Sequence, residues 1–272
     1  MLYNILIRAF IPPGKSFPER SIVIMKFRIL AVSISLLVLS AAVTGCGRKY
    51  VRLQELPVLN YTPPAQGDDI IVMKVKDYGE IKIRLFPELL PEACENFVTL
   101  ANDGYYDELI FHRVISDFMI QGGDPKGDGT GGESCWGGQF DGGVSSQLIH
   151  LPGALAYANA GMTSTDGSQF YIVTGQDVDN AFLDTLTEQN AIYFSQEARE
   201  LYTQHGGTPF LDGNYTVFGQ VIDGLDIVEA ISHVETNADD KPKKAVYLES
   251  VRTEPYDNGQ IRWYPADYEQ EP

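Results

Sequence analysis

The alternation of apolar and polar positions after residue 68 predicts a β-rich domain that opens with a hairpin and a helix. Two strands, Ile70–Val75 and Glu80–Leu85, flank the turn residues Asp77-Tyr78-Gly79, a combination that favours a hairpin. Apolar residues at helical spacing follow Pro91 and stop at Gly104. This spacing predicts an amphipathic helix between the two.

Two short apolar runs in the next part of the chain carry polar residues that need an explanation. Phe111–Ile115 and Phe118–Gln121 flank a two-residue turn, and their length and their β-branched and aromatic content favour two strands over a helix. The first run contains Arg113 and the second ends in Gln121. Because a guanidinium keeps its charge, Arg113 requires either a paired anion, such as Asp124 in a purely structural role, or a water-accessible cavity.

The second half of the chain continues the same mixture of strands and helices. Ala191–His205 has helical spacing, with Ser195 as the predicted N-cap and Gly206 as the stop. The other predicted elements are a strand over Ser168–Val173, a strand after the turn Asp212-Gly213, a helix over Gly224–Ile231 and a closing strand over Ala245–Val251.

The stretch from Phe111 to Asp124 reads Phe-His-Arg-Val-Ile-Ser-Asp-Phe-Met-Ile-Gln-Gly-Gly-Asp. It resembles the signature of the cyclophilin family of peptidyl-prolyl cis–trans isomerases, which is Phe-His-Arg-Val-Ile-x-x-Phe-Met-Ile-Gln-Gly-Gly-Asp. Two further blocks, at 155–172 and 208–221, also resemble the family, and the resemblance covers Asp69 to Val251. It implies a mainly β fold, a closed eight-stranded antiparallel barrel capped by two α-helices. Residues 175–206 are longer than the family's usual connection and are expected to form a partly helical insertion.

The resemblance also implies a reaction and a set of site residues. Rotation about an X–Pro amide makes and breaks no covalent bond, so no nucleophile, metal or cofactor is required. Arg113 matches the catalytic arginine that donates to the prolyl nitrogen in the twisted state, and Gln121 would orient its guanidinium. The matching substrate-binding positions are Phe118, Met119, Tyr171, Phe210, Leu211 and Tyr215 around the proline pocket, and Ala158, Asn159, Ala160 and Gln169 along the groove.

Three of these residues depart from the usual family pattern. Tyr171 replaces a phenylalanine, Phe210 a tryptophan and Tyr215 a histidine. The hydroxyl of Tyr171 is expected to enter an apolar pocket floor and to change the preferred residue before proline. Phe210 lacks the indole N–H that contributes to cyclosporin binding in sensitive members, so weak inhibition is expected. Tyr215 removes a titrating group, so activity should be flat across neutral pH.

A glycine-dense loop, 122–143, formally matches nucleotide-binding motifs. No helical pattern follows the loop, Glu133 stands where a phosphate loop has its lysine, and Asp124 and Asp128 would repel phosphate. We therefore interpret the loop as one wall of the substrate groove, as the resemblance implies.

The N-terminal part has the pattern of an exported lipoprotein. A positive segment beginning at Met25, the expected start, precedes the apolar run Ile29–Val43, which is shorter than the roughly 20 residues of a spanning helix. Val43-Thr44-Gly45-Cys46 resembles a bacterial lipobox, which implies that Cys46 is diacylated and holds the protein on the extracytoplasmic side of the cell membrane. An ordinary signal peptide or an uncleaved anchor is the alternative.

The expected segments are an extension and signal peptide over 1–45, a lipidated cysteine and tether over 46–68, the isomerase domain over 69–253 and a tail over 254–272.

The composition of the chain limits the binding partners and the kinds of functional site that can be expected. The formal charge is -17 and the first 45 residues are net basic, so the rest of the chain is strongly acidic and nucleic acid is not expected as a partner. The expected partners are proline-containing exported polypeptides and, through Cys46, the membrane. The four histidines lack metal-ligand spacing, and His112 is expected to be a structural hydrogen-bond partner. Cys94 and Cys135 could pair in an exported protein.

Two functions remain open from the sequence. The first is a surface-tethered prolyl isomerase that assists the folding of exported proteins. The second is a weakly catalytic chaperone or docking module on the same scaffold, with an altered pocket. The presence of both Arg113 and Gln121 favours the isomerase.

Overall fold

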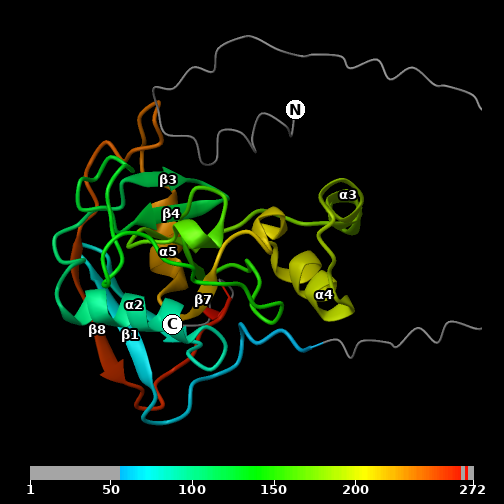
Figure 1. Cartoon of the computed structure of the whole chain (residues 1–272), viewed down its shortest axis with the longest axis horizontal. Coiled ribbons are helices and arrows are strands. Elements are labelled where there is room, and N and C mark those ends of the chain that lie inside the picture. The colour runs from blue at the N-terminus through cyan, green and yellow to red at the C-terminus, as the bar shows by residue number, and fades with distance from the viewer. Residues whose placement is uncertain (1–55, 265–266, 269–272) are drawn as a thin grey trace, which may run out of the picture. The chain divides into compact units, whose positions relative to one another are not determined.

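The computed structural model describes residues 56–264, 267 and 268 (Figure 1). The predicted signal peptide, the expected start at Met25 and the proposed lipidation at Cys46 lie outside these residues. Within the described part, no helix has both the length and the apolar character needed to cross a membrane.

One antiparallel sheet of eight strands forms the body of the protein. Its strands are β1 (Asp69–Val75), β2 (Gly79–Leu85), β3 (Arg113–Ile115), β4 (Met119–Gly122), β5 (Ala154–Tyr157), β6 (Phe170–Val173), β7 (Val217–Asp223) and β8 (Leu248–Pro255). Their order across the sheet is β3-β4-β6-β5-β7-β2-β1-β8. The predicted hairpin is confirmed, with Val75 opposite Gly79 where β1 turns into β2. The mainly β prediction is also confirmed.

The expected closed barrel is wrong, because the sheet is curled but its two edges do not pair as strands within the described residues. The edge strand β3 has only three residues and forms no strand ladder with β8, the strand at the opposite edge. Irregular chain bridges the gap instead: the Phe111 N–H donates to the Val246 carbonyl at 3.0 Å, and the Leu248 N–H donates to the Leu109 carbonyl at 2.8 Å.

Four α-helices accompany the sheet in the described part of the chain: α2 (Pro91–Asn102), α3 (Asn180–Asn190), α4 (Gln196–His205) and α5 (Leu225–Ser232). The two helices expected from the resemblance are α2, which packs against β7 and β8, and α5, which packs against β2, β3 and β4. The insertion contains α3 and α4, which Figure 1 shows beside the sheet. The N-cap prediction for α4 is confirmed, since Ser195 Oγ accepts from the Ala198 N–H at 3.1 Å.

The alternation of side chains along β1 shows how the sheet is covered on both faces. Ile71 and Met73 are fully buried in the main core, which is rich in stacked aromatic rings such as Tyr157 on Phe218 at 4.3 Å. Ile70 on the opposite face packs with Tyr256 from the C-terminal segment. The chain after β8 therefore returns over the outer face of the sheet.

The segments that flank the sheet domain are also fixed to it where the structure describes them. Asn60, within the expected tether, is fully buried, and its Nδ2 donates to the Ile149 carbonyl and to Gln220 Oε1, both at 2.9 Å. In the tail, the Tyr268 hydroxyl accepts from the Gly224 N–H at 2.8 Å, at the start of α5. Both segments thus supply hydrogen bonds that the sheet domain would otherwise lack.

Candidate functional site

The strand pair β3–β4 places Arg113 directly opposite Gln121. Arg113 is 17% exposed, and its Nε lies 3.6 Å from Oδ2 of Asp240, which belongs to a loop after α5. Burial lowers the pKa of the guanidinium and Asp240 raises it, so the group keeps its charge in a partly buried place. The required anion is therefore Asp240, and the suggested pairing with Asp124 is wrong.

The carboxylate of Asp124 instead binds backbone N–H groups of the glycine loop, residues 122–143. Its carboxylate accepts from the N–H groups of Lys126 at 2.8 Å, Asp128 at 3.1 Å and Gly129 at 2.6 Å. These three bonds hold the backbone of the loop around the carboxylate. Further along the loop, Gly132 has a φ of +101°, and a Cβ there would collide with Ser168 Oγ, so this position requires glycine.

The glutamines behind Arg113 form a chain of hydrogen bonds to the loop. Gln121 Nε2 donates to Gln169 Oε1 at 2.9 Å, and Gln169 Nε2 donates to the Gly131 carbonyl at 2.7 Å. Because the amide nitrogen of Gln121 is used in this way, its oxygen is the atom that can accept from a guanidinium. The amide is thus oriented by the loop.

A groove of about 810 Å³ runs past these side chains. It is lined by six of the residues predicted for the site, namely Arg113, Gln121, Ala158, Asn159, Ala160 and Gln169. The loop residues 127–132 form another part of its wall, as predicted, and residues 237–241 a third. This third part, which includes Asp240, was not predicted, because nothing in its sequence marks it as lying near Arg113.

Asn159 is held by a buried carboxylate. Its Nδ2 donates to Asp166 Oδ1 at 3.0 Å, and the other oxygen of Asp166 accepts from Thr216 Oγ1 at 2.7 Å. Asp166 is fully buried, and burial raises the pKa of its carboxyl to about 6 against the hydrogen bonds that lower it. The side chain of Asn159 therefore has one fixed orientation at the groove.

None of the other six predicted residues lines this groove; they lie in or against the main core and make aromatic and apolar contacts there. The rings of Phe118 and Phe210 stack with their centroids 5.8 Å apart, and those of Tyr171 and Tyr215 meet edge to face at 6.2 Å. The other two members, Met119 and Leu211, are buried in the main core. Phe118 immediately precedes β4.

The hydroxyl of Tyr171 lies against a polar group in the protein interior. It is 2.9 Å from His150 Nε2, and His150 Nδ1 is 2.7 Å from Asp212 Oδ1. Sequence reasoning missed this arrangement, because His150 lies just outside the recognisable blocks and Asp212 was interpreted only as a turn residue. The hydroxyl therefore has a partner away from the groove.

His112 differs from its prediction as a hydrogen-bond partner. It is 5% exposed, and neither ring nitrogen has a hydrogen-bond partner among the described residues. Burial lowers the pKa of His112 to about 4, so the ring is neutral at pH 7 and does not add charge beside Arg113.

Cys94 and Cys135 are both free thiols in the structure, Cys94 being buried and Cys135 half-buried. The described residues contain no group of three histidine, cysteine or acidic side chains with the geometry to hold a metal ion.

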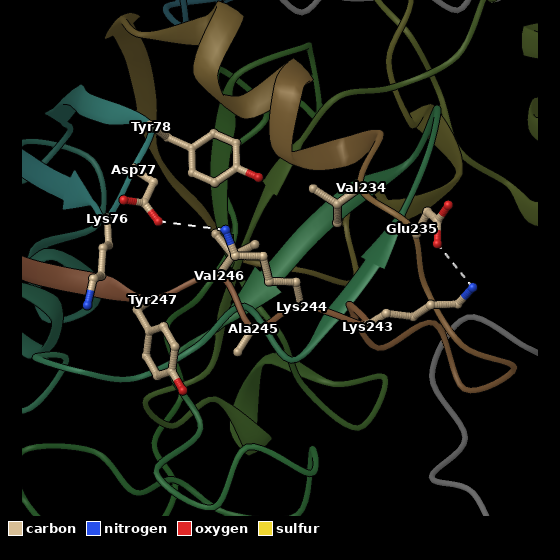
Figure 2. Close-up of a pocket in the computed structure, with 10 residues that line it drawn as sticks. All are labelled: Lys76, Asp77, Tyr78, Val234, Glu235, Lys243, Lys244, Ala245, Val246 and Tyr247. Carbon is tan, nitrogen blue, oxygen red and sulfur yellow. Dashed lines mark hydrogen bonds and ion pairs between the residues drawn. The ribbon is translucent and has the colours of Figure 1, made fainter.

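A second hollow, of about 610 Å³, lies away from these residues between the β1–β2 turn and the chain before β8 (Figure 2). Four of its five charged side chains form ion pairs: Lys243 Nζ is 3.1 Å from Glu235 Oε2, and Lys244 Nζ is 3.8 Å from Asp77 Oδ2. No predicted site residue lines this hollow.

The family model for cyclophilin-type peptidyl-prolyl cis–trans isomerases matches residues 70–253. The chain belongs to this family. A Staphylococcus aureus (strain COL) relative named as a peptidyl-prolyl cis–trans isomerase is 45% identical over 189 residues, which is 70% of this chain and 93% of the relative. A Staphylococcus haemolyticus (strain JCSC1435) relative of the same name is 43% identical over the same shares.

Solved cyclophilins agree with this assignment. The structure of a cyclophilin-type isomerase from Cryptosporidium parvum, determined in the presence of the dipeptide Ala-Pro, superposes with a TM-score of 0.55 at 29% identity, covering 69% of this chain and 99% of that one. The same protein without the dipeptide gives a TM-score of 0.56. The present cyclophilin is therefore an enzyme of the prolyl isomerase class.

Proposed function

We propose that this cyclophilin accelerates X–Pro rotation in exported polypeptides while it is held on the outer side of the cytoplasmic membrane by acyl chains on Cys46. The basic and apolar segments before Cys46 support the location. Two acyl chains give stable attachment, because each buried methylene contributes about 0.8 kcal/mol. The natural task would be to assist folding outside the cell membrane.

The catalytic step needs a donor aimed at the prolyl nitrogen. Amide resonance sets a rotation barrier of about 18–20 kcal/mol, and in the twisted amide the nitrogen becomes a better hydrogen-bond acceptor. A group that binds the twisted state more tightly than the planar one lowers the barrier. In our proposal this group is Arg113, and the observation that supports it most strongly is that Arg113, Gln121 and Asn159 line the same groove.

The neighbours of Arg113 would keep the donor aimed. Asp240 lies on one side of the guanidinium, and the Gln121 oxygen is presented from the adjacent strand because Gln169 uses its nitrogen. A donor fixed before the reaction needs no reorganisation when the amide twists. Asn159, oriented by Asp166, would bind the backbone of the substrate.

The aromatic and apolar residues that match the family's proline pocket would receive the proline ring. Phe118 and Phe210 stack on each other, and Met119, Leu211, Tyr171 and Tyr215 complete the apolar surroundings. Proline offers a compact apolar ring with no N–H, so an aromatic and aliphatic pocket suits it. Roles for these six residues follow from their match to the family and from this clustering.

The decisive experiment compares Arg113→Ala with Arg84→Ala in the full chain. Arg84 is a matched control, because it is 15% exposed, pairs with Glu88 at 3.0 Å and does not line the groove. With a proline tetrapeptide, kcat/KM of Arg113→Ala should fall about 10²- to 10³-fold, as for loss of one transition-state donor, and that of Arg84→Ala should stay near wild type. An equal loss in both variants would refute the role of Arg113.

The alternative, a weakly catalytic docking module, makes a different prediction in the same assay. In that case wild type and Arg113→Ala would turn over equally slowly while proline peptides still bound. The location is tested separately by labelling cells with a radioactive fatty acid: label in the wild type and none in Cys46→Ala is expected. Label-free protein in both strains would refute the lipid anchor.

A further inference from the structure

A continuous chain of buried polar groups joins the insertion to the pocket residue Tyr171. The Tyr202 hydroxyl on α4 donates to Asp212 Oδ2 at 2.8 Å, and the other carboxylate oxygen lies 2.7 Å from His150 Nδ1. His150 Nε2 then meets the Tyr171 hydroxyl at 2.9 Å. Four side chains from separate parts of the sequence thus form one line of hydrogen bonds.

The burial of these groups makes their arrangement specific. Tyr171 and Tyr202 have no exposed surface, His150 is 1% exposed, and the Asp212 side chain is 12% exposed. Asp212 accepts three donors, because the His150 backbone N–H also points to it at 3.1 Å. A buried carboxylate is tolerated only when it is satisfied in this way, so loss of one donor alters the position of the others.

The hydrogen-bond directions follow from the carboxylate. An ionised Asp212 can only accept, so His150 donates to it from Nδ1, and this leaves Nε2 facing the Tyr171 hydroxyl at 2.9 Å. The rings of His150 and Tyr171 also lie nearly parallel, 6.1 Å apart, and the Tyr215 ring meets His150 edge to face at 6.5 Å. The orientation of the Tyr171 ring is therefore fixed by its stacking on His150 and by the contact of its hydroxyl with His150 Nε2.

The same carboxylate fixes a second wall of the pocket. Asp212 follows directly on the short 3₁₀ turn Pro209–Leu211 and is its C-cap. Phe210 and Leu211 in this turn are two of the proposed pocket residues. A shift of Asp212 would consequently move this turn as well as the His150 ring.

The insertion supplies the far end of the chain and packs on the same segment as His150. Tyr202 belongs to a small second core with Leu183 of α3 and with Ile149 and Leu151, which flank His150 in sequence. The two helices of the insertion thus have their own apolar contacts, and α4 adds one hydroxyl to the polar line. Packing alone does not require this hydroxyl.

We propose that α4 of the insertion positions the proline pocket: Tyr202, Asp212 and His150 act as positioning residues that set the Tyr171 ring and the turn carrying Leu211. The inference rests on the proposed pocket role of Tyr171. It gives the insertion a part in substrate selection, because the Tyr171 ring, the proposed pocket floor, is held through its hydroxyl by His150. The residue preferred before proline then depends on a helix outside the sheet.

The test is Tyr202→Phe in the full chain, with Tyr157→Phe as the matched control. Tyr157 is equally buried, and its hydroxyl donates to the Ala93 carbonyl and accepts from Asn96 Nδ2, both at 2.8 Å, in the main core. We expect Tyr202→Phe to raise KM for proline tetrapeptides roughly tenfold, to leave kcat nearly unchanged and to alter the ranking of residues before proline. Tyr157→Phe should lower stability similarly and leave both parameters and the ranking unchanged.

A double-mutant cycle with Tyr171→Phe separates positioning from a general loss of stability. Once the Tyr171 hydroxyl is gone, Tyr202→Phe should produce no further rise in KM, because the hydrogen bond that links His150 to Tyr171 is already lost. If Tyr202→Phe raised KM by the same factor in both backgrounds, or changed nothing in the wild-type background, the proposal would be refuted.

Measuring the affinity for the same tetrapeptides by calorimetry distinguishes failure of the positioning proposal from failure of the proposed isomerase function. If the wild type proved catalytically inactive, the isomerase step would fail while the affinities still decided on the positioning role. In that case a roughly tenfold weaker affinity in Tyr202→Phe, absent in Tyr157→Phe and absent when Tyr171 is already phenylalanine, would support it. Equal affinities in the wild type, the three single variants and the double variant would overturn it.

Discussion

Replacing Asp166 by asparagine should change the pH dependence of stability in a way that can be calculated from its surroundings. The carboxyl is fully buried, and its pKa is raised from 3.8 to about 6. A raised pKa means that the folded protein binds the proton more tightly than the unfolded chain does. This group's stabilisation is therefore fully present below the unfolded pKa and is lost as the pH rises through about 6.

The size of the effect follows from the shift. At 1.36 kcal/mol for each pKa unit, ionisation of Asp166 lowers the free energy of unfolding by about 3 kcal/mol at pH 8 relative to the protonated state. Asparagine cannot ionise, so the variant lacks this decline. The difference in unfolding free energy, variant minus wild type, should rise with pH across this window and reach a plateau above pH 7. Any constant loss from the altered hydrogen bonds to Asn159 and Thr216 cancels in that comparison.

Urea unfolding followed by tryptophan fluorescence at several pH values measures this difference directly. Asp103→Asn is a suitable control, because Asp103 is exposed at the end of α2, and its difference from the wild type should be constant across the window. A flat difference for Asp166→Asn would refute the raised pKa. A difference that fell with rising pH would show that the hydrogen bonds from Asn159 and Thr216 outweigh burial.

Three further predictions concern the pocket and the insertion. Phe210→Trp should strengthen inhibition by cyclosporin, measured as IC50 in the isomerisation assay, because it restores an indole N–H; an unchanged IC50 would contradict this. Tyr215→His should add a step in the pH profile of kcat/KM near the histidine pKa of about 6.5, whereas the wild type should be flat across neutral pH; a step near pH 6.5 in the wild type would contradict this. Ser195→Ala should lower the free energy of unfolding by about 1 kcal/mol through loss of the N-cap bond to Ala198, and no change in the urea midpoint would show that this end of α4 frays.

Local signals in the sequence predicted the elements that local chemistry determines. The two short runs around Arg113 became β3 and β4 with Arg113 opposite Gln121, because β-branched content and a two-residue turn are sufficient to specify a hairpin. Ser195 capped α4 as expected. Helix α3 was missed, since its buried face consists of only Leu183 and Leu186 and therefore gives a weak periodic signal.

Contacts between distant segments were not readable from the sequence. Asp240 follows Arg113 by more than a hundred residues, and nothing near it distinguishes it from the many other acidic residues of an acidic chain. The pairing of His150 with Asp212 is equally non-local. The error over barrel closure has the same origin, because a strand's partner across the seam depends on the lengths of the edge strands, which the sequence predicted least well.

The burial of Asn60 sets a limit on where this enzyme can work. With lipid on Cys46, only 11 residues, or 12 Cα–Cα steps, would separate this cysteine from Val58, which is buried against the domain. Even fully extended, such a stretch spans at most about 43 Å. If the proposed lipid anchor is present, the groove would therefore serve only chains that come close to the bilayer.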